Sequence, residues 1–232
     1  MIFRPFEPFI FIPEIAYTLI IVVFCLIIYF KTKDIYDLTR YEGIRYFREA
    51  FLLFSVSYII RFFNGIIMFS DMTLGSGFPR REFLPMFFIP PLMGYFSTIA
   101  IFYLVYSSFW KELNRKYMLI FFHAFAVVLS IATFLTRSQM VLLIVQSVLL
   151  ITVAVSVFIP GKNKKKNKKI SQTKIIYLMI FVLWIINIWI LYMPRRPGPR
   201  EFMPRFGAGL ALQIISVCVF FALYHKIKKW KI

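Results

Sequence analysis

Long apolar runs, separated by short polar segments, dominate the chain. A helix needs about 20 apolar residues to cross the hydrocarbon layer of a bilayer. We therefore predict an all-α, polytopic membrane protein with seven transmembrane helices. The predicted helices are Phe9–Phe30, Phe47–Phe69, Leu84–Phe109, Tyr117–Leu135, Met140–Pro160, Lys174–Met193 and Phe206–Tyr224. Barrel strands do not fit, because they alternate between apolar and polar positions over about 10 residues, whereas these runs are continuous.

The composition also favours a membrane protein. Of the 232 residues, 60% are hydrophobic and 16% are charged, whereas charged residues make up roughly 25% of an ordinary soluble domain. A soluble domain of this length cannot keep so much apolar surface away from water. The first apolar run is too long for a secretory signal and lacks its basic start, so we expect it to remain as a span.

The charge distribution predicts the orientation. A formal net charge of +18 would suit nucleic-acid binding, but the basic residues lie almost entirely between the apolar runs. Loops that face an anionic leaflet explain this placement better, so no nucleic-acid partner is expected. With the N-terminus outside, the inner segments hold 19 Lys and Arg and the outer segments hold 8. The positive-inside rule thus predicts an N-out, C-in, multi-pass protein of the cell membrane.

Two inner segments stand out by their charge. Lys31–Tyr46 is a mixed-charge loop that is expected to be partly helical and to lie at the interface. Lys162–Lys169 is a low-complexity basic run. It is expected to anchor the topology, and the alternative is a docking site for anionic lipid or an acidic partner.

A short motif occurs twice. Arg81–Phe87 reads REFLPMF, and 119 residues later Arg200–Phe206 reads REFMPRF, with five identities in seven positions. Each copy follows a linker rich in Pro, Gly and Arg and opens an apolar run. Allowing a four-residue gap, Asn64 upstream of the first copy corresponds to Asn187 upstream of the second. Chance combined with shared helix-start preferences is the alternative explanation.

The repeat predicts two related halves within one membrane domain. Residues 1–110 would form the first three-helix repeat and residues 138–232 the second, with a linker helix in 111–137. An odd number of linker spans gives both repeats the same orientation, as in parallel repeats related by an axis along the membrane normal.

This three-plus-one-plus-three plan, with its N-out orientation, is similar in outline to the SWEET and PQ-loop sugar and amino-acid transporters. The resemblance implies transport of a small solute by a duplicated bundle. It transfers no functional residue, because the Pro-Gln pair of the PQ-loop group is absent. Microbial opsins share the helix number and orientation, but they attach retinal to a lysine in the seventh span. Phe206–Tyr224 contains no lysine, so no retinal cofactor is expected.

Ionisable residues inside spans are costly and mark candidate sites. Arg61 lies about eight residues from the outer end of the second predicted helix, and Glu14 lies near the outer end of the first, so the two can pair. Asn64 is one helical turn from Arg61. The functional interpretation is a site for an anionic or polar ligand with Arg61 as its anchor. The alternative is a structural ion pair or an arginine that snorkels to the surface.

Other polar residues extend this candidate site. Asn187 is the counterpart of Asn64 in the second half, and Gln213 occupies the position of Gly94 at the 119-residue offset. Interhelical hydrogen bonding is the alternative role for both, as it is for Gln146 and His123. The candidate ligand-binding residues are Arg61, Asn64, Asn187, Glu14 and Gln213.

Pro90 and Pro91, followed by Gly94, lie within the third predicted helix and should kink or break it. These residues form a candidate hinge for alternating access, and packing is the alternative role.

Enzyme chemistry finds little support. The two histidines lie in distant segments, Cys25 and Cys218 lie inside apolar runs, and no metal-ligand spacing or nucleophile–base arrangement appears. We expect no enzyme, cofactor or metal.

The sequence favours a small-solute transporter or permease with a polar cavity between two repeats. The alternatives are a seven-helix sensor that signals through its inner loops to a separate partner, and a structural membrane subunit. Homo-oligomers or a protein partner are compatible with each alternative, and the ligand is an unknown small molecule.

Overall fold

The computed structural model describes residues 7–73, 84–109, 115–136, 139–158, 172–192 and 202–228, and every element in them is an α-helix. The helices are α1 Glu7–Thr39, α2 Glu42–Thr73, α3 Leu84–Phe109, α4 Arg115–Thr136, α5 Gln139–Phe158, α6 Gln172–Tyr192 and α7 Phe202–Lys228. The predicted all-α class is confirmed.

Five of these helices contain a segment that is long and apolar enough to cross a membrane. The segments are Ile12–Thr39, Glu42–Ile67, Phe88–Ser108, Tyr117–Thr136 and Gly207–Lys228. In α5 and α6 the described apolar segments are shorter, Met140–Thr152 and Ile175–Asn187. The chain is therefore an integral membrane protein.

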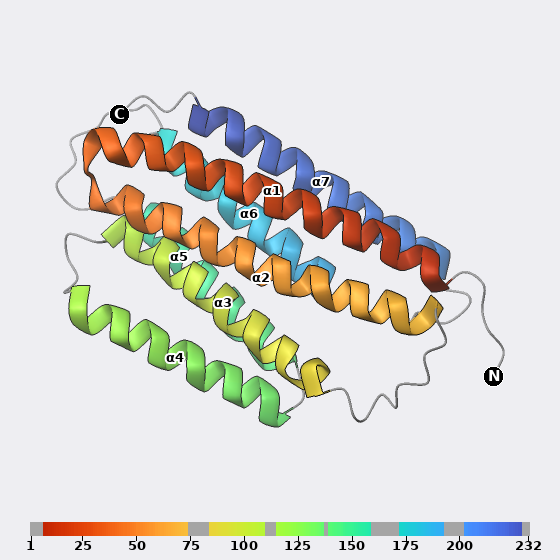
Figure 1. The fold of residues 1–232 in the computed structure, drawn as a ribbon. Coiled ribbons are helices and arrows are strands. Elements are labelled where there is room, and N and C mark those ends of the chain that lie inside the picture. The colour runs from red at the N-terminus through yellow and green to blue at the C-terminus, as the bar shows by residue number, and fades with distance from the viewer. Residues whose placement is uncertain are drawn as a thin grey trace.

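Six of the helices form a closed ring. α1 packs against α2 and α7, α2 against α3, α3 against α5, α5 against α6, and α6 against α7. The fourth helix packs against α3 and α5 and lies at the edge of the bundle, outside the ring (Figure 1). The middle helix of the chain is thus not needed to close the ring.

A single cluster of buried hydrophobic side chains fills much of the ring and takes members from all six of its helices. Its members include Ile21 and Ile28 of α1, Phe47 of α2, Leu104 of α3, Leu150 of α5, Leu183 of α6 and Phe220 of α7. A second, smaller cluster joins α4 to the ring, where the rings of Phe102 and Phe122 stack with centroids 4.5 Å apart.

The outer surface is apolar as well. On α5, Ile144, Val148, Ile151 and Val155 recur every three or four residues, and all four are at least half exposed. A helix that is apolar on its outward face fits a lipid environment. This surface agrees with the membrane assignment.

The segment Lys31–Tyr46, predicted as a partly helical loop, is helical over most of its length. α1 continues to Thr39 and α2 begins at Glu42, so two residues connect the helices. Ion pairs within one helix stabilise both extensions: Lys31 lies 3.7 Å from Asp34, and Arg45 lies 3.0 Å from Glu49.

Arg48 of α2 also ties the two extensions together. Its guanidinium lies over the rings of Tyr29 and Tyr36 on α1, 5.3 Å and 5.2 Å from their centroids. Such cation–π contacts stabilise a helix pair by about 0.5–1 kcal/mol each at exposed sites. The long hairpin therefore remains helical beyond the ends of the predicted spans, Phe30 and Phe47.

Several predicted features lie outside the described residues. They are the basic run Lys162–Lys169, Arg81–Phe83 in the first copy of the repeated motif, and Arg200 and Glu201 in the second. The remainder of each copy forms the start of a helix, α3 at Leu84 and α7 at Phe202.

The turn between α1 and α2 gives a testable prediction. Arg40 has a φ of 53°, and its N–H donates to the Tyr36 carbonyl at 2.7 Å. The left-handed conformation costs a residue with a Cβ about 1–2 kcal/mol. Arg40→Gly should stabilise the protein by up to about 1 kcal/mol, and Arg40→Val should destabilise it by about 1–2 kcal/mol. Unfolding in detergent micelles measures both; equal stability of the two variants would contradict the turn geometry.

Candidate functional site

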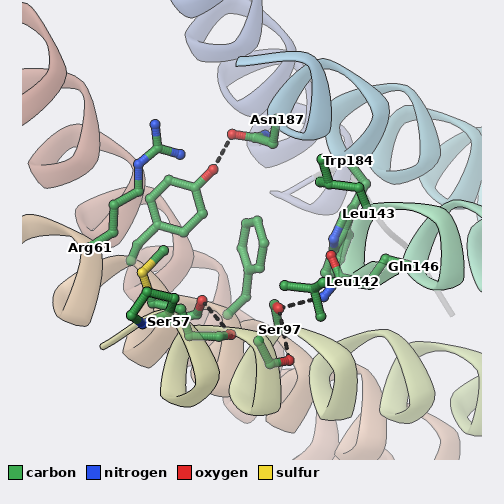
Figure 2. Close-up of a pocket in the computed structure, with 13 residues that line it drawn as sticks. Ser57, Arg61, Ser97, Leu142, Leu143, Gln146, Trp184 and Asn187 are labelled. Carbon is green, nitrogen blue, oxygen red and sulfur yellow. Dashed lines mark hydrogen bonds between the residues drawn. The ribbon is translucent and has the colours of Figure 1, made fainter. Parts of the chain in front are cut away.

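A cavity of about 60 Å³ lies inside the ring, between α2, α3, α5 and α6. Since roughly 10–15 Å³ of such volume holds one water molecule, it has room for on the order of four waters or a solute of similar size. Its polar lining consists of Ser57, Tyr58, Arg61, Ser97, Gln146 and Asn187. Its apolar lining consists of Phe54, Pro90, Met93, Gly94, Leu142, Leu143 and Trp184. Figure 2 shows Arg61 on the side opposite Trp184 and Leu143.

The cavity exists because two facing helices are held apart. In the described residues, no Cα atom of α2 lies within 8 Å of one in α6. Gly94 contributes no side chain to the space between α3 and α5, and a Cβ there would lie 3.2 Å from both δ carbons of Leu142. Gly94 therefore permits the close approach of α3 and α5 without filling the cavity.

Arg61 is the charged group of the cavity lining. It is 4% exposed, and its Nη2 donates to Glu14 Oε1 at 3.0 Å. Its Cζ lies 5.7 Å from the centroid of the Tyr58 ring. Nε and Nη1 of Arg61 are buried and have no hydrogen-bond partner in the described part of the chain. The Glu14–Arg61 contact expected from the sequence is present, and two donors of the guanidinium remain unused.

Asn187 of α6 joins four helices. Its Oδ1 accepts hydrogen bonds from the hydroxyls of Tyr58 on α2 and Tyr17 on α1, the latter at 2.5 Å (Figure 2 shows the Tyr58 bond). Its Nδ2 donates to the Leu183 carbonyl at 2.7 Å and lies 3.5 Å from Ser216 Oγ on α7. The Tyr17 hydroxyl is also 2.9 Å from that serine. All these groups are buried, so the network stabilises the packing of α1, α2, α6 and α7.

Gln146 of α5 makes a similar connection to α3. Its Nε2 donates to Ser97 Oγ at 2.6 Å and to Thr98 Oγ1 at 3.2 Å. On the other side of α3, Ser57 of α2 donates to the Met93 carbonyl at 3.2 Å. The interhelical role expected for Gln146 is thus observed.

Three of the candidate ligand-binding residues, Asn64, Gln213 and Glu14, do not line the cavity. Asn64 lies on α2 about one turn beyond Arg61, where the cavity has ended, and Gln213 lies part-buried on α7. Glu14 contacts Arg61 of the lining. Arg61 and Asn187 are brought together at the cavity. Ligand binding by all five residues stays a prediction.

The candidate hinge is part of a continuous helix. α3 runs through Pro90 and Pro91 without interruption, so the predicted break is absent. Pro90 and Gly94 line the cavity, and the Pro91 carbonyl accepts a hydrogen bond from Ser130 of α4 at 2.9 Å. Movement about these residues stays a prediction.

His123 lies apart from the cavity, between α3 and α4. Its Nδ1 is 3.0 Å from the Tyr95 hydroxyl and its Nε2 is 3.5 Å from the Tyr103 hydroxyl. This is the interhelical bonding expected of an intramembrane histidine. Within the ranges that the structure describes, no group of three or more His, Cys, Asp or Glu residues could hold a metal ion.

The sequence interpretation missed Tyr17, Ser216 and Trp184. In an apolar run, Tyr17 and Trp184 resemble any other aromatic residue. Ser216 did carry a signal, because it occupies the position of Ser97 at the 119-residue offset of the repeated motif.

Comparison with known proteins adds a relative of the whole chain. A protein from Archaeoglobus fulgidus, described as an uncharacterized protein, is 27% identical to this chain over 219 residues, which are 92% of this chain and 90% of the relative. The similarity therefore spans most of the length of both chains. No family model and no solved structure matches the chain.

The Asn187 network predicts a large effect of one substitution. Asn187→Leu removes the acceptor of two buried tyrosine hydroxyls, and each unsatisfied group costs about 1–3 kcal/mol, less where it finds another partner in the membrane. We expect a loss of about 2 kcal/mol in the free energy of unfolding in detergent.

Asn64→Leu is the matched control, because it makes the same change one turn beyond the cavity and should cost under about 1 kcal/mol. Adding Tyr17→Phe and Tyr58→Phe to Asn187→Leu should recover part of the loss, since polar partners removed together leave fewer unsatisfied groups. Equal effects of the two asparagine substitutions would contradict the role of Asn187 in stabilising the helix packing.

Proposed function

We propose that the protein is a small-solute transporter or permease of the cell membrane, with seven spans, an N-out, C-in orientation and two three-helix halves, α1–α3 and α5–α7. The observation that carries the proposal is the cavity, which is lined by two helices from each half. Transporters built from repeats bind their solutes at the interface of the repeats. The fourth helix connects the halves.

The packing order of the helices supports the two halves. Exchanging α1 with α5, α2 with α6 and α3 with α7 converts each packed pair of the ring into another packed pair. The pair α3–α5, for example, becomes α7–α1. This is the pattern expected of parallel repeats about an axis along the membrane normal.

Two serines at equivalent positions support the same relation. Ser97 of α3 and Ser216 of α7 are related by the 119-residue offset. Ser97 is bonded by Gln146 from α5, the first helix of the second half, and Ser216 is bonded by Tyr17 from α1, the first helix of the first half. Each half therefore contributes a polar bond of the same kind to the interface.

Helix lengths are compatible with seven spans. α5 has 20 residues and α6 has 21, which at 1.5 Å per residue gives each a length of about 30 Å, close to the thickness of the hydrocarbon layer. The orientation rests on the excess of Lys and Arg in the inner segments.

The proposed mechanism is a rocking of the two halves about the cavity. The hydrogen bonds that cross the interface include Tyr58–Asn187, Tyr17–Ser216 and Gln146–Ser97. If the bonds on one side of the cavity break, solute enters from that side. The bonds on the other side remain and keep that side closed. Pro90, Pro91 and Gly94 supply the bending point of α3 in this proposal.

A sensor is the second candidate, and one observation favours it. α1 has 33 residues and α2 has 32, about 50 Å each at 1.5 Å per residue, which exceeds the bilayer. The excess forms the charged hairpin near Arg48, which would offer a separate signalling protein a rigid surface on the inner side. A structural membrane subunit could use the same surface. None of these three hypotheses includes an enzymatic activity or a nucleic-acid partner.

Blocking the cavity tests transport. In proteoliposomes, the protein should raise the flux of a permeant solute from a panel of small sugars, polyols, amino acids and carboxylates. Gly94→Leu should lower that flux at least about tenfold, because even a Cβ at this position presses on Leu142 and a full side chain fills the cavity. Gly207→Leu is the matched control, since a Cβ at Gly207 meets nothing within 4 Å.

Unchanged flux in Gly94→Leu, with wild-type flux present, would place the path elsewhere. Absence of flux for the whole panel, together with specific capture of a soluble protein by the α1–α2 hairpin, would favour the sensor.

The orientation has a separate test. In bacteria, a fluorescent protein fused after Ile232 should fold and fluoresce, because N-out, C-in places it in the cytoplasm. A periplasmic alkaline phosphatase at the same position should be inactive. The opposite pair of results would reverse the orientation and exclude an odd number of spans with the N-terminus outside.

A further inference from the structure

We propose that the ligand of the cavity is a small monocarboxylate whose carboxylate is bound by Arg61. The inference rests on the proposed function for its biological meaning, but it concerns binding and can fail or succeed independently of transport. Four features of the cavity lead to it: unused donors, the sign of the charge, the shape of the guanidinium, and the available volume.

The first feature is the unused donors. Arg61 is more than nine-tenths buried and lines the cavity, and its Nε and Nη1 have no hydrogen-bond partner in the described part of the chain. A buried charged donor without an acceptor is strongly unfavourable. Both nitrogens are covered by protein atoms in this structure, so the guanidinium must turn toward the cavity before the acceptor oxygens of a ligand there satisfy these N–H groups. Asn187, another polar residue of the lining, already has both of its amide atoms engaged.

The second feature is the sign of the charge. The side chain of Glu14 is 18% exposed, whereas that of Arg61 is 3% exposed. Water screens the more exposed charge more strongly, so the carboxylate cancels only part of the positive potential that Arg61 creates inside. The described residues that line the cavity include no acidic one. An anion is therefore favoured over a neutral solute and over a cation.

The third feature is the shape of the guanidinium. It is planar and presents its donors in a fork that matches the two oxygens of a carboxylate. Glu14 uses one N–H of Nη2, so the second N–H of Nη2, paired with the adjacent N–H of Nε or Nη1, can form a fork for a second carboxylate. A lysine would offer a point charge without this directionality.

The fourth feature is the volume and the opposite wall. Space for on the order of four waters fits a carboxylate of about four to six non-hydrogen atoms, from acetate to lactate. The wall facing Arg61 includes Trp184 and Leu143 (Figure 2), which suits a short hydrocarbon tail. A dicarboxylate would need a second cation, and among the described residues of the lining Arg61 alone is charged.

The test uses Trp184 as a reporter, because its indole lines the cavity. In a background with Trp110, Trp189 and Trp230 replaced by Phe, the purified full-length protein is titrated with acetate, propionate and lactate in detergent at constant sodium chloride. We expect a saturable change in fluorescence. Acetamide has the shape of acetate without its charge and should bind at least about tenfold more weakly.

Three variants examine the role of Arg61. Glu14→Gln combined with Arg61→Gln removes both charges, so that neither is left buried and unpaired. This double variant should weaken acetate binding at least about tenfold. Arg61→Lys keeps the charge without the fork and should weaken it by a smaller factor. Arg45→Gln is the control: Arg45 is a partly exposed arginine of the same helix that pairs with Glu42 and Glu49 outside the cavity, and acetate binding should be unchanged.

The proposal is overturned if acetamide binds as tightly as acetate, if the double variant binds acetate like the wild type, or if nitrate or chloride binds and the carboxylates do not. Acetate binding without flux of any solute would contradict the transport proposal and support the carboxylate site. Flux of an uncharged solute without acetate binding would support the transport proposal and contradict the carboxylate site.

Discussion

In the interior of this bundle a polar group needs a partner, because no bulk water is available to it, and the side-chain amide of Asn187 meets that need for four helices at once. Tyr17, Tyr58 and Ser216 bring α1, α2 and α7 to the same point on α6. The backbones of α2 and α6 do not touch in the described residues. A bridge of side chains therefore sets their separation, and that separation is the width of the cavity.

The interior polar groups divide into two classes. Asn187 and Gln146 are engaged by neighbouring helices, so they determine how the ring is assembled. Arg61 is engaged through one nitrogen and leaves two others without acceptors. Because buried polar groups are nearly always satisfied, unsatisfied donors on a residue that lines the cavity identify the side chain with capacity to bind something else. Gly94 keeps the space beside it open.

Much of the fold follows from hydrophobic run length alone, since crossing lipid demands a helix of known size. The Glu14–Arg61 contact was also predictable, because an arginine that deep needs a carboxylate within reach. The last turns of α1 and the first turns of α2 were not predictable. A charged segment such as 31–46 is compatible with a loop and also with a helix stabilised by local ion pairs. Tyr17 was missed because an aromatic residue in an apolar run does not reveal whether its hydroxyl is used.

The meeting of α1 with α7 bears on how the protein is made. Tyr17 and Ser216, which bond across that contact, are 199 residues apart in the chain. A ribosome adds roughly 5–20 residues per second, so α1 would remain in the bilayer for on the order of ten seconds or more before α7 exists. During that time the hydroxyl of Tyr17 would face lipid or a chaperone. Membrane insertion and ring closure are therefore separate events, and the cavity forms only at the second.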